Sequence, residues 1–155
     1  MTQFSNFAIR VLMYTALNDA GPTPVPEIAR AYGASYDHMK KAAALLCRLG
    51  YLKSVRGRVG GVSLARLPQE IGIGEVIRAT ENDVVLVECF DSSTNTCPLE
   101  PACILKRALH EAVDAFFASL DRYTLADLIC HPEQLSPLLA LTSHGAGIEG
   151  RVRCG

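Results

Sequence analysis

The segment from residue 24 to residue 66 constrains the fold most, because it encodes three elements in a fixed order. Its first part, "PVPEIARAYG", predicts a short helix with Pro26 in the first turn and Gly33 as its stop. The next part, "ASYDHMKKAAALLCRLG", predicts a second helix that Ser35 caps and Gly50 ends. The alternating segments "YLKSVRG" and "VSLAR", joined by "RVGG", predict a β-hairpin. This order of elements is typical of a winged helix-turn-helix.

The positive charge of the chain is concentrated in the same region. The 155 residues carry a formal net charge of −1. Residues 1–66 nevertheless hold nine Lys or Arg residues against three acidic ones, a balance of +6, whereas residues 67–155 hold six against thirteen, a balance of −7. A randomly uneven surface is one explanation of this division. Because the basic half coincides with the predicted winged helix-turn-helix, we interpret it as a surface for double-stranded operator DNA.

The start of the second predicted helix is expected to meet base edges in the major groove, since recognition helices present their N-terminal residues there. These residues are Ser35, Tyr36, His38 and Lys41, with Lys40 beside them as a phosphate contact. Tyr36 has a structural alternative, packing on the preceding helix. For His38 the alternative is an ordinary surface histidine.

The hairpin turn supplies the second part of the predicted DNA-binding surface. Arg56 and Arg58 fall at its tip, where a guanidinium can enter a narrow minor groove or hold a phosphate. Gly57, Gly60 and Gly61 allow the turn to bend and to approach the DNA backbone closely.

The remaining pattern predicts further helices and a dimer. Residues 4–19 and 71–81 read as amphipathic helices, whereas 84–90 reads as either a strand or one helical turn. Residues 102–121 predict a long helix that is apolar on more than one face. We expect this helix to pair with its copy in a homodimer, although burial within one chain is the alternative. The predicted dimerisation residues recur every three or four positions and are Leu105, Leu109, Ala112, Phe116 and Leu120.

Composition places the chain among soluble proteins of a reducing compartment. No apolar run is long enough to span a membrane, and "MTQFSNFAIR" has no signal-peptide pattern, so we expect a cytoplasmic protein. The chain also shows no paired carboxylates near a histidine, no Gly-rich phosphate loop and no nucleophile elbow. These patterns argue against an enzyme.

Three of the six cysteines lie close together, in "ECFDSSTNTCPLEPAC". Cys89, Cys97 and Cys103 are separated by seven and five residues in a polar loop that ends where the long helix begins. Structural zinc sites usually have paired, closely spaced cysteines and four good ligands, which this loop does not offer. Three thiolates with a weaker fourth ligand suit a reactive iron–sulfur cluster. Three incidental cysteines, one of them oxidisable, are the alternative. Cys47 reads as a core residue, and Cys130 and Cys154 have no partners in register.

Together these features resemble the winged-helix repressors that carry an iron–sulfur cluster, the group that contains NsrR, IscR and RirA. The resemblance covers residues 4–135 and includes "FSNFAIRVLMY", "EIARAYG", "DHMKKAAALL", "VRGRVGGVSLAR", "IGIGEVIRATE" and "PACILKRALHEAVDAFFASLDRYTLADL". It implies a homodimeric transcriptional repressor that responds through its cluster. The sequence around the cysteines is most similar to that of the nitric-oxide sensors of the group. This similarity favours a [4Fe–4S] cluster over [2Fe–2S].

The resemblance also leaves alternatives open. The seven-residue gap is similar to that of iron-responsive members, and a cluster-free thiol-redox regulator is a further alternative. IscR-like proteins have a histidine three residues after the third cysteine, where this chain has Lys106. The nitric-oxide sensors can take an aspartate ligand from the first helix of the partner subunit. The matching residue is Asn6, whose amide oxygen is a weaker ligand, so water, a small thiol or another side chain are alternatives.

The expected fold is thus mainly α with a small β-hairpin wing. We expect a winged helix-turn-helix DNA-binding domain at residues 1–68 and a cluster-binding loop with a dimerisation helix at 69–135. Residues 136–155 are expected to form a flexible tail. Its "IEGR" has the form of a protease-cleavage site, which is either a remnant of an added tag or a chance occurrence.

Overall fold

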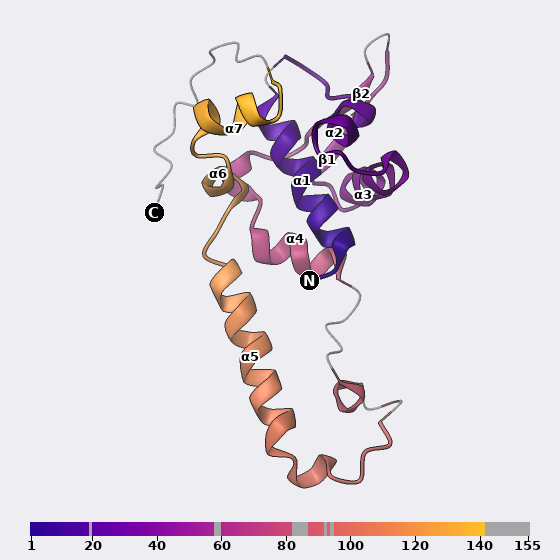
Figure 1. The fold of residues 1–155 in the computed structure, drawn as a ribbon, viewed down its shortest axis with the longest axis vertical. Coiled ribbons are helices and arrows are strands. Elements are labelled where there is room, and N and C mark those ends of the chain that lie inside the picture. Colours follow the sequence, from indigo (N-terminus) through magenta and orange to yellow (C-terminus); the bar gives the residue numbers. More distant parts are fainter. Residues whose placement is uncertain (19, 58–59, 82–86, 92, 94, 142–155) are drawn as a thin grey trace.

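The computed structural model describes residues 1–18, 20–57, 60–81, 87–91, 93 and 95–141. Most helices form one body, from which a single long helix, α5, projects, with the cysteine loop at its far end (Figure 1). The elements in chain order are α1 (Gln3–Leu17), α2 (Val25–Ala31), α3 (Tyr36–Arg48), β1 (Leu52–Val55), β2 (Gly61–Leu64), α4 (Ile73–Thr80), α5 (Ile104–Leu120), α6 (Leu125–Leu128) and α7 (Pro132–Leu138).

The winged helix-turn-helix forms because α1, α2 and α3 bury their apolar faces against one another. Leu12, Ile28, Met39 and Leu46 are fully buried between them. Gly33, at φ +56°, makes the left-handed turn that ends α2 and allows α3 to begin at once. The predicted order of helix, turn and helix is therefore confirmed.

The hairpin is fastened to the helices by a short backbone bridge. Its two strands are antiparallel, with Leu52 opposite Leu64. Thr23 exchanges two backbone hydrogen bonds with Val62, of 2.8 and 2.9 Å. Gly61 is required beside this bridge, because a Cβ there would lie 2.3 Å from the carbonyl oxygen of Thr23. The predicted wing is present, and its second strand is held to the body through Thr23.

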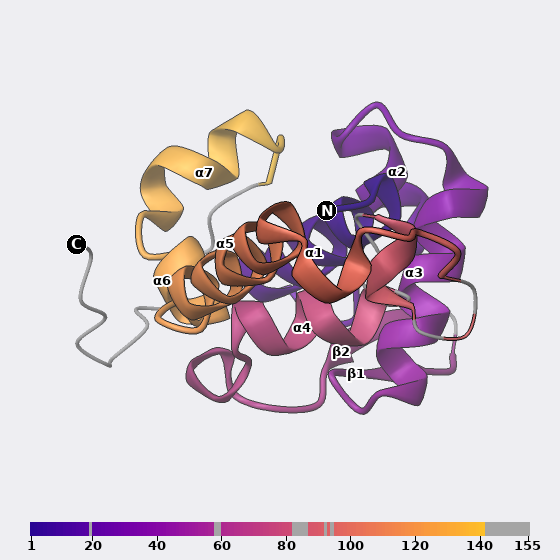
Figure 2. The same cartoon turned by 90° about the horizontal axis from the view of Figure 1, so that it is seen from below.

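The long helix is oriented by its last turn. Arg78 of α4 donates two hydrogen bonds to Asp121, of 2.6 and 2.7 Å, and its guanidinium lies 4.3 Å from the centre of the Phe117 ring. Gly74 leaves the space for Asp121, since a Cβ there would lie 2.0 Å from the carboxylate. The body thus holds the C-terminal end of α5 in place. Figure 2 shows α6 and α7 on one side of the α5 axis and α3 on the other.

The C-terminal part of the structure departs from the sequence prediction. A helix, α7, runs from Pro132 to Leu138, where the flexible tail was expected to begin at residue 136. Ser136 is buried, and its carbonyl oxygen accepts a 2.9 Å hydrogen bond from the backbone N–H of Leu141. Pro137 within the segment hid this short helix, because proline in a helical pattern normally indicates a stop. Residues 142–155, including "IEGR" and Cys154, lie outside the described residues.

Segment 84–90 was predicted as a strand or one helical turn. Its described part contains a single 3-10 turn at Glu88–Phe90. The described helices include none that is long and apolar enough to cross a membrane.

Candidate DNA-binding surface and cysteine loop

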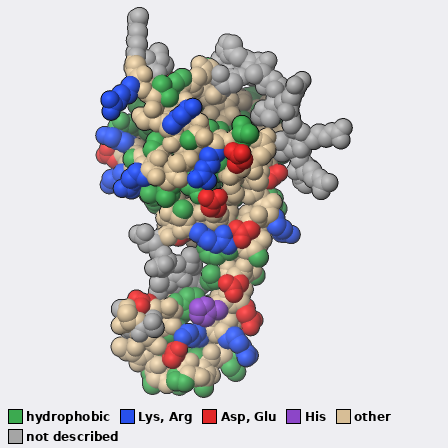
Figure 3. All heavy atoms as spheres, turned by 180° about the vertical axis from the view of Figure 1, so that it is seen from behind, with side chains coloured by type: hydrophobic (Ala, Val, Ile, Leu, Met, Phe, Trp, Pro, Cys, Tyr) green, Lys and Arg blue, Asp and Glu red, His purple; other side chains and the backbone are tan. Residues whose placement is uncertain are grey.

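The first two turns of α3 present the predicted DNA contacts on the surface. Ser35 occupies the N-cap position but its side chain makes no capping hydrogen bond. The Tyr36 side chain is 45% exposed, and the Lys40 ammonium lies 6.0 Å from its ring centre. Tyr36 therefore lies on the surface at the start of α3. Lys41 is exposed on the same part of the helix. In Figure 3, Lys and Arg side chains gather on the edge of the body that carries α3 and the hairpin.

His38 differs from its neighbours, because it also contacts the first helix. Its ring stacks on that of Phe7 in α1, with centres 5.4 Å apart and an angle of 12° between the planes. Phe7 is only 7% exposed, whereas His38 remains exposed. A groove of about 400 Å³ adjoins the stack and is lined by Thr2, Gln3, Phe4, Phe7, His38 and Lys41. His38 is thus a link between α1 and the recognition helix as well as a candidate DNA contact.

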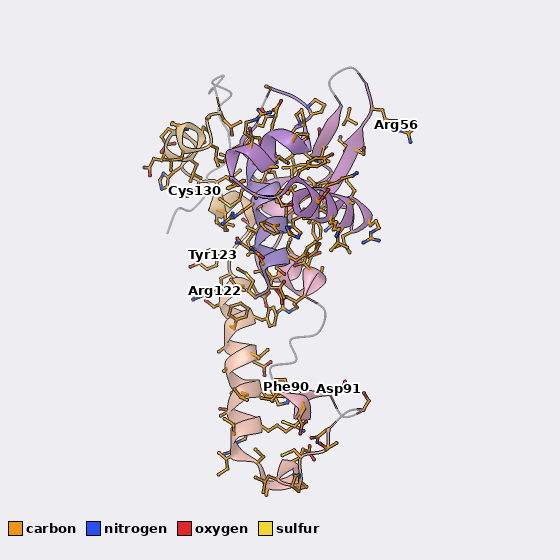
Figure 4. All side chains as sticks on the ribbon, turned by 45° about the vertical axis from the view of Figure 1, so that its right-hand side comes forward. Arg56, Phe90, Asp91, Arg122, Tyr123 and Cys130 are labelled. Carbon is orange, nitrogen blue, oxygen red and sulfur yellow. The ribbon has the colours of Figure 1, made fainter. Side chains whose placement is uncertain are left out.

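The wing presents Arg56 to solvent at the beginning of the turn (Figure 4). Gly57 follows at φ +144°, a backbone conformation that side chains other than glycine rarely adopt. Arg58, the second predicted wing arginine, lies outside the described residues.

We expect Arg56→Ala to weaken binding to operator and random DNA alike and to lower the salt slope of log affinity by about one unit. The reason is that an exposed guanidinium at a hairpin tip reaches phosphates or the minor groove. Titrations of both duplexes at several salt concentrations measure this effect. Arg122→Ala, which removes an exposed charge beyond the end of α5, is the matched control.

A base-reading residue would behave differently. Tyr36→Ala is expected to cost about 1–3 kcal/mol on the operator and little on random DNA. If Arg56→Ala instead lost only operator binding at an unchanged salt slope, the wing would read bases and this division of roles would fail.

The cysteine loop is anchored to α5 at both of its ends. Near Cys89, the Phe90 ring stacks on His110 of α5, with centres 3.9 Å apart and 9° between the planes. At the other end, Cys103 is the N-cap residue of α5, and its sulfur accepts a 3.4 Å hydrogen bond from the backbone N–H of Lys106. The three predicted cysteines therefore lie in one loop that first contacts α5 through Phe90 and ends at the N-cap of that helix.

The donor set of this loop suits an iron–sulfur cluster. Cys89, Cys97 and Cys103 are free thiols of intermediate exposure, so their sulfurs are neither fully buried nor fully solvated. A recess of about 430 Å³ adjoins Cys103 and is lined by Pro98, Leu99, Pro101, Ala102 and Ile104. In the part of the chain that the structure describes, no three His, Cys, Asp or Glu side chains stand close enough together to hold a metal ion.

The other described cysteines lie elsewhere. Cys47 packs against the core from α3, and burial raises the pKa of its thiol. Cys130 lies in the body next to α6, away from the loop (Figure 4).

Asn6, the predicted fourth ligand, is half-buried on α1, immediately before Phe7. The start of α1 is tied to the end of α4 through Glu81. The Glu81 carboxylate accepts hydrogen bonds of 2.6 Å from the backbone N–H of Thr2 and 2.5 Å from the Ser5 hydroxyl. Burial opposes ionisation of this carboxyl, but the hydrogen bonds from Ser5 and Thr2 outweigh it and lower the pKa of Glu81. Glu81, after which the chain continues toward the cysteine loop, therefore lies beside the N-terminal end of α1.

The predicted dimerisation face of α5 is largely uncovered in the single chain. Leu105 is 63% and Phe116 42% exposed, Ala112 is exposed, and Leu109 and Leu120 are half-buried. Phe117, which faces α4, is the one residue of the helix that is buried. The alternative of a helix buried wholly within its own chain does not hold for the described residues. An apolar helical face of this length is expected to bind a partner.

Comparison with known proteins places these features in a family. The model of the Rrf2 family, described as an iron-dependent transcriptional regulator, matches residues 1–131. The chain is a member of the Rrf2 family. It is therefore a transcriptional regulator and not an enzyme, as the sequence predicted. The family assignment agrees with the winged helix-turn-helix and the long helix of the structure.

Relatives of this Rrf2 regulator are named as transcriptional regulators. The HTH-type transcriptional regulator NsrR of Halalkalibacterium halodurans is 42% identical over 91% of this chain and 97% of its own. NsrR of Geobacillus kaustophilus is 45% identical over 90% and 95%. Among solved structures, T. potens IscR aligns with a TM-score of 0.68 at 25% identity, over 94% of this chain and 93% of its own. CymR, the global cysteine regulator of B. subtilis, aligns with a TM-score of 0.68 at 28% identity, over 84% and 96%.

Several contacts of the site were not predicted from the sequence. The stacking of Phe90 on His110 was missed, although an aromatic beside Cys89 and a histidine two turns into the helix were visible signals. The ion pair between Lys106 and Glu100 was also missed, because five residues lie between the two across a change of backbone direction.

Proposed function

We propose that this Rrf2 regulator is a homodimeric repressor whose operator affinity depends on an iron–sulfur cluster and falls in response to nitric oxide. The observation that carries the proposal is the cysteine loop, which presents three half-buried thiols in a chain related to NsrR. We propose Cys89, Cys97 and Cys103 as ligands, with Asn6 of the partner subunit at the fourth position. A [4Fe–4S] cluster is favoured by the likeness to NsrR.

The position of the loop supports control of the partner subunit. In a single chain the loop stands at the far end of α5, whereas α3 lies in the body (Figure 1). The loop is thus too far from its own recognition helix to act on it directly. Antiparallel pairing of the exposed α5 faces of two chains would carry each loop toward the other chain's body. Asn6 would then be reached by the loop of the opposite chain.

The Phe7–His38 stack supplies a route from that contact to DNA. Asn6 adjoins Phe7, whose ring holds His38 of the recognition helix at 5.4 Å. A shift of α1 that accompanies the gain or loss of a contact at Asn6 would therefore tilt α3. Such coupling requires that the loop bind one arrangement of α1 more strongly than the other. The two recognition helices would fit successive major grooves in that arrangement alone.

Two signals are candidates, nitric oxide and iron supply. When bound, the cluster supplies iron that nitric oxide attacks, and Asn6 offers only a weak amide ligand that can be displaced. The sequence likeness to NsrR favours nitric oxide, whereas the seven-residue spacing between Cys89 and Cys97 favours iron supply. A cluster-free thiol switch is the alternative mechanism.

Nitric oxide and iron chelation can be compared directly on the same complex. We expect stoichiometric nitric oxide to bleach the visible absorption of the anaerobic protein and to release operator DNA within seconds to minutes. Mild chelation at low oxygen should act much more slowly, because the three thiolates retain the iron. The absorption and the fluorescence anisotropy of labelled operator report both events. The reverse ranking would make the protein iron-responsive, and a colourless anaerobic protein would favour the thiol switch.

A further inference from the structure

Lys106 connects three parts of the cysteine loop. Its ammonium forms an ion pair with Glu100, which begins the 3-10 turn Glu100–Ala102. Its backbone N–H donates the hydrogen bond to the sulfur of Cys103. Both side chains of the ion pair are more than half shielded from solvent, with 25% of Lys106 and 35% of Glu100 exposed. Lys106 thereby ties the segment between Cys97 and Cys103 to the first turn of α5.

Lys106 also lies one helical turn before His110, on the face of α5 that the start of the loop approaches. Cys89 is brought there by the stacking of Phe90 on His110. Lys106 is therefore held where both ends of the loop meet α5.

This arrangement answers a physical requirement of the proposed cluster. Three thiolates gathered in one loop repel one another, and the repulsion is stronger where water is partly excluded. A cation placed between them offsets part of that repulsion. Arg107, the next residue, cannot do so, since its side chain is 76% exposed and pairs with Glu111 on the outer surface of α5.

We propose that Lys106 is the resident cation of the cysteine loop, held in place by Glu100, and that its charge retains the iron–sulfur cluster. The inference rests on the proposed function, because it assigns Lys106 a role toward the same three thiolates. Lys106 is a positioning residue in this scheme, acting on the thiolates and not as an iron ligand.

The test measures the rate at which anaerobic, cluster-loaded protein loses its visible absorption to an iron chelator. Lys106→Met is expected to accelerate the loss about tenfold, the lower end of what outer-shell partners of metal ligands typically contribute. Lys106→Arg should restore the wild-type rate to within a few-fold, because it keeps the charge. Arg107→Met, the matched control, should leave the rate unchanged. Thermal melts of the cluster-free variants establish that each chain is folded.

A double variant separates the charge of Lys106 from the effect of leaving Glu100 unpaired. Lys106→Met with Glu100→Gln should lose the cluster as fast as Lys106→Met alone. Recovery of the wild-type rate in the double variant would overturn the proposal, as would equal rates for Lys106→Met and Arg107→Met. Wild-type protein that never acquires a cluster would instead refute the proposed function.

Discussion

Cys97→Ala is expected to yield a folded dimer that holds no iron–sulfur cluster. Cys97 lies between the two anchored ends of the loop, so its removal leaves α5 capped by Cys103 and the Phe90–His110 stack intact. Two thiolates cannot replace three as ligands of a cluster. Iron and sulfide content after anaerobic reconstitution, with the visible spectrum, measures the loss. Cys89→Ala and Cys103→Ala should behave in the same way.

The remaining cysteines provide matched controls for this prediction. Cys130→Ala removes a half-buried thiol from the body, away from the loop, and should retain the full iron content (Figure 4). Cys47→Ala removes a thiol that packs against the core and should also keep the cluster, with a modest loss of stability. If Cys130 proved as necessary as Cys97, the assignment of three ligands to the loop would be wrong.

Ala112→Glu is expected to convert the dimer into monomers and to abolish tight operator binding. Ala112 lies in the middle of the apolar face of α5 and is exposed in the single chain, so the longer side chain fits an isolated subunit. In a dimer the two carboxylates would be buried without partners, at about 3–5 kcal/mol, which corresponds to at least a hundredfold loss of association. Sedimentation equilibrium and operator titration measure the two effects.

Ala118→Glu is the control for dimer formation. Ala118 is also exposed on α5, but it lies about 240° around the helix axis from Ala112. The same substitution there should leave the dimer and its operator affinity unchanged. A monomeric Ala118→Glu, or a dimeric Ala112→Glu, would show that the chains pair through another surface.

The body of the protein was predictable because its signals are local. Gly33 and Gly50 adopt the positive φ that ends a helix, and Pro26 lies in the first turn of α2. These residues act within a few positions of themselves, so the sequence alone places the elements. The long helix followed from its apolar spacing, which the structure places at Ile104–Leu120.

The site was less predictable because its contacts join distant segments. Glu81 meets Ser5 and Thr2 across more than seventy residues, and Arg78 meets Asp121 across 43. No periodic pattern reports such pairs. The stacking of His38 on Phe7 is of this kind, and it adds a link between helices to the two predicted roles of His38, a DNA contact or an ordinary surface histidine. The convergence of the three thiols remains a prediction.

Operator affinity of the loaded and the cluster-free dimer, measured side by side without oxygen, tests the proposed control most directly. A labelled operator duplex is titrated with each form at one salt concentration, and a scrambled duplex reports non-specific binding. The loaded dimer should bind the operator about 5- to 150-fold more tightly, the range of a typical coupling free energy, and the two forms should bind the scrambled duplex equally. Equal operator affinities would contradict control of DNA binding by the cysteine loop.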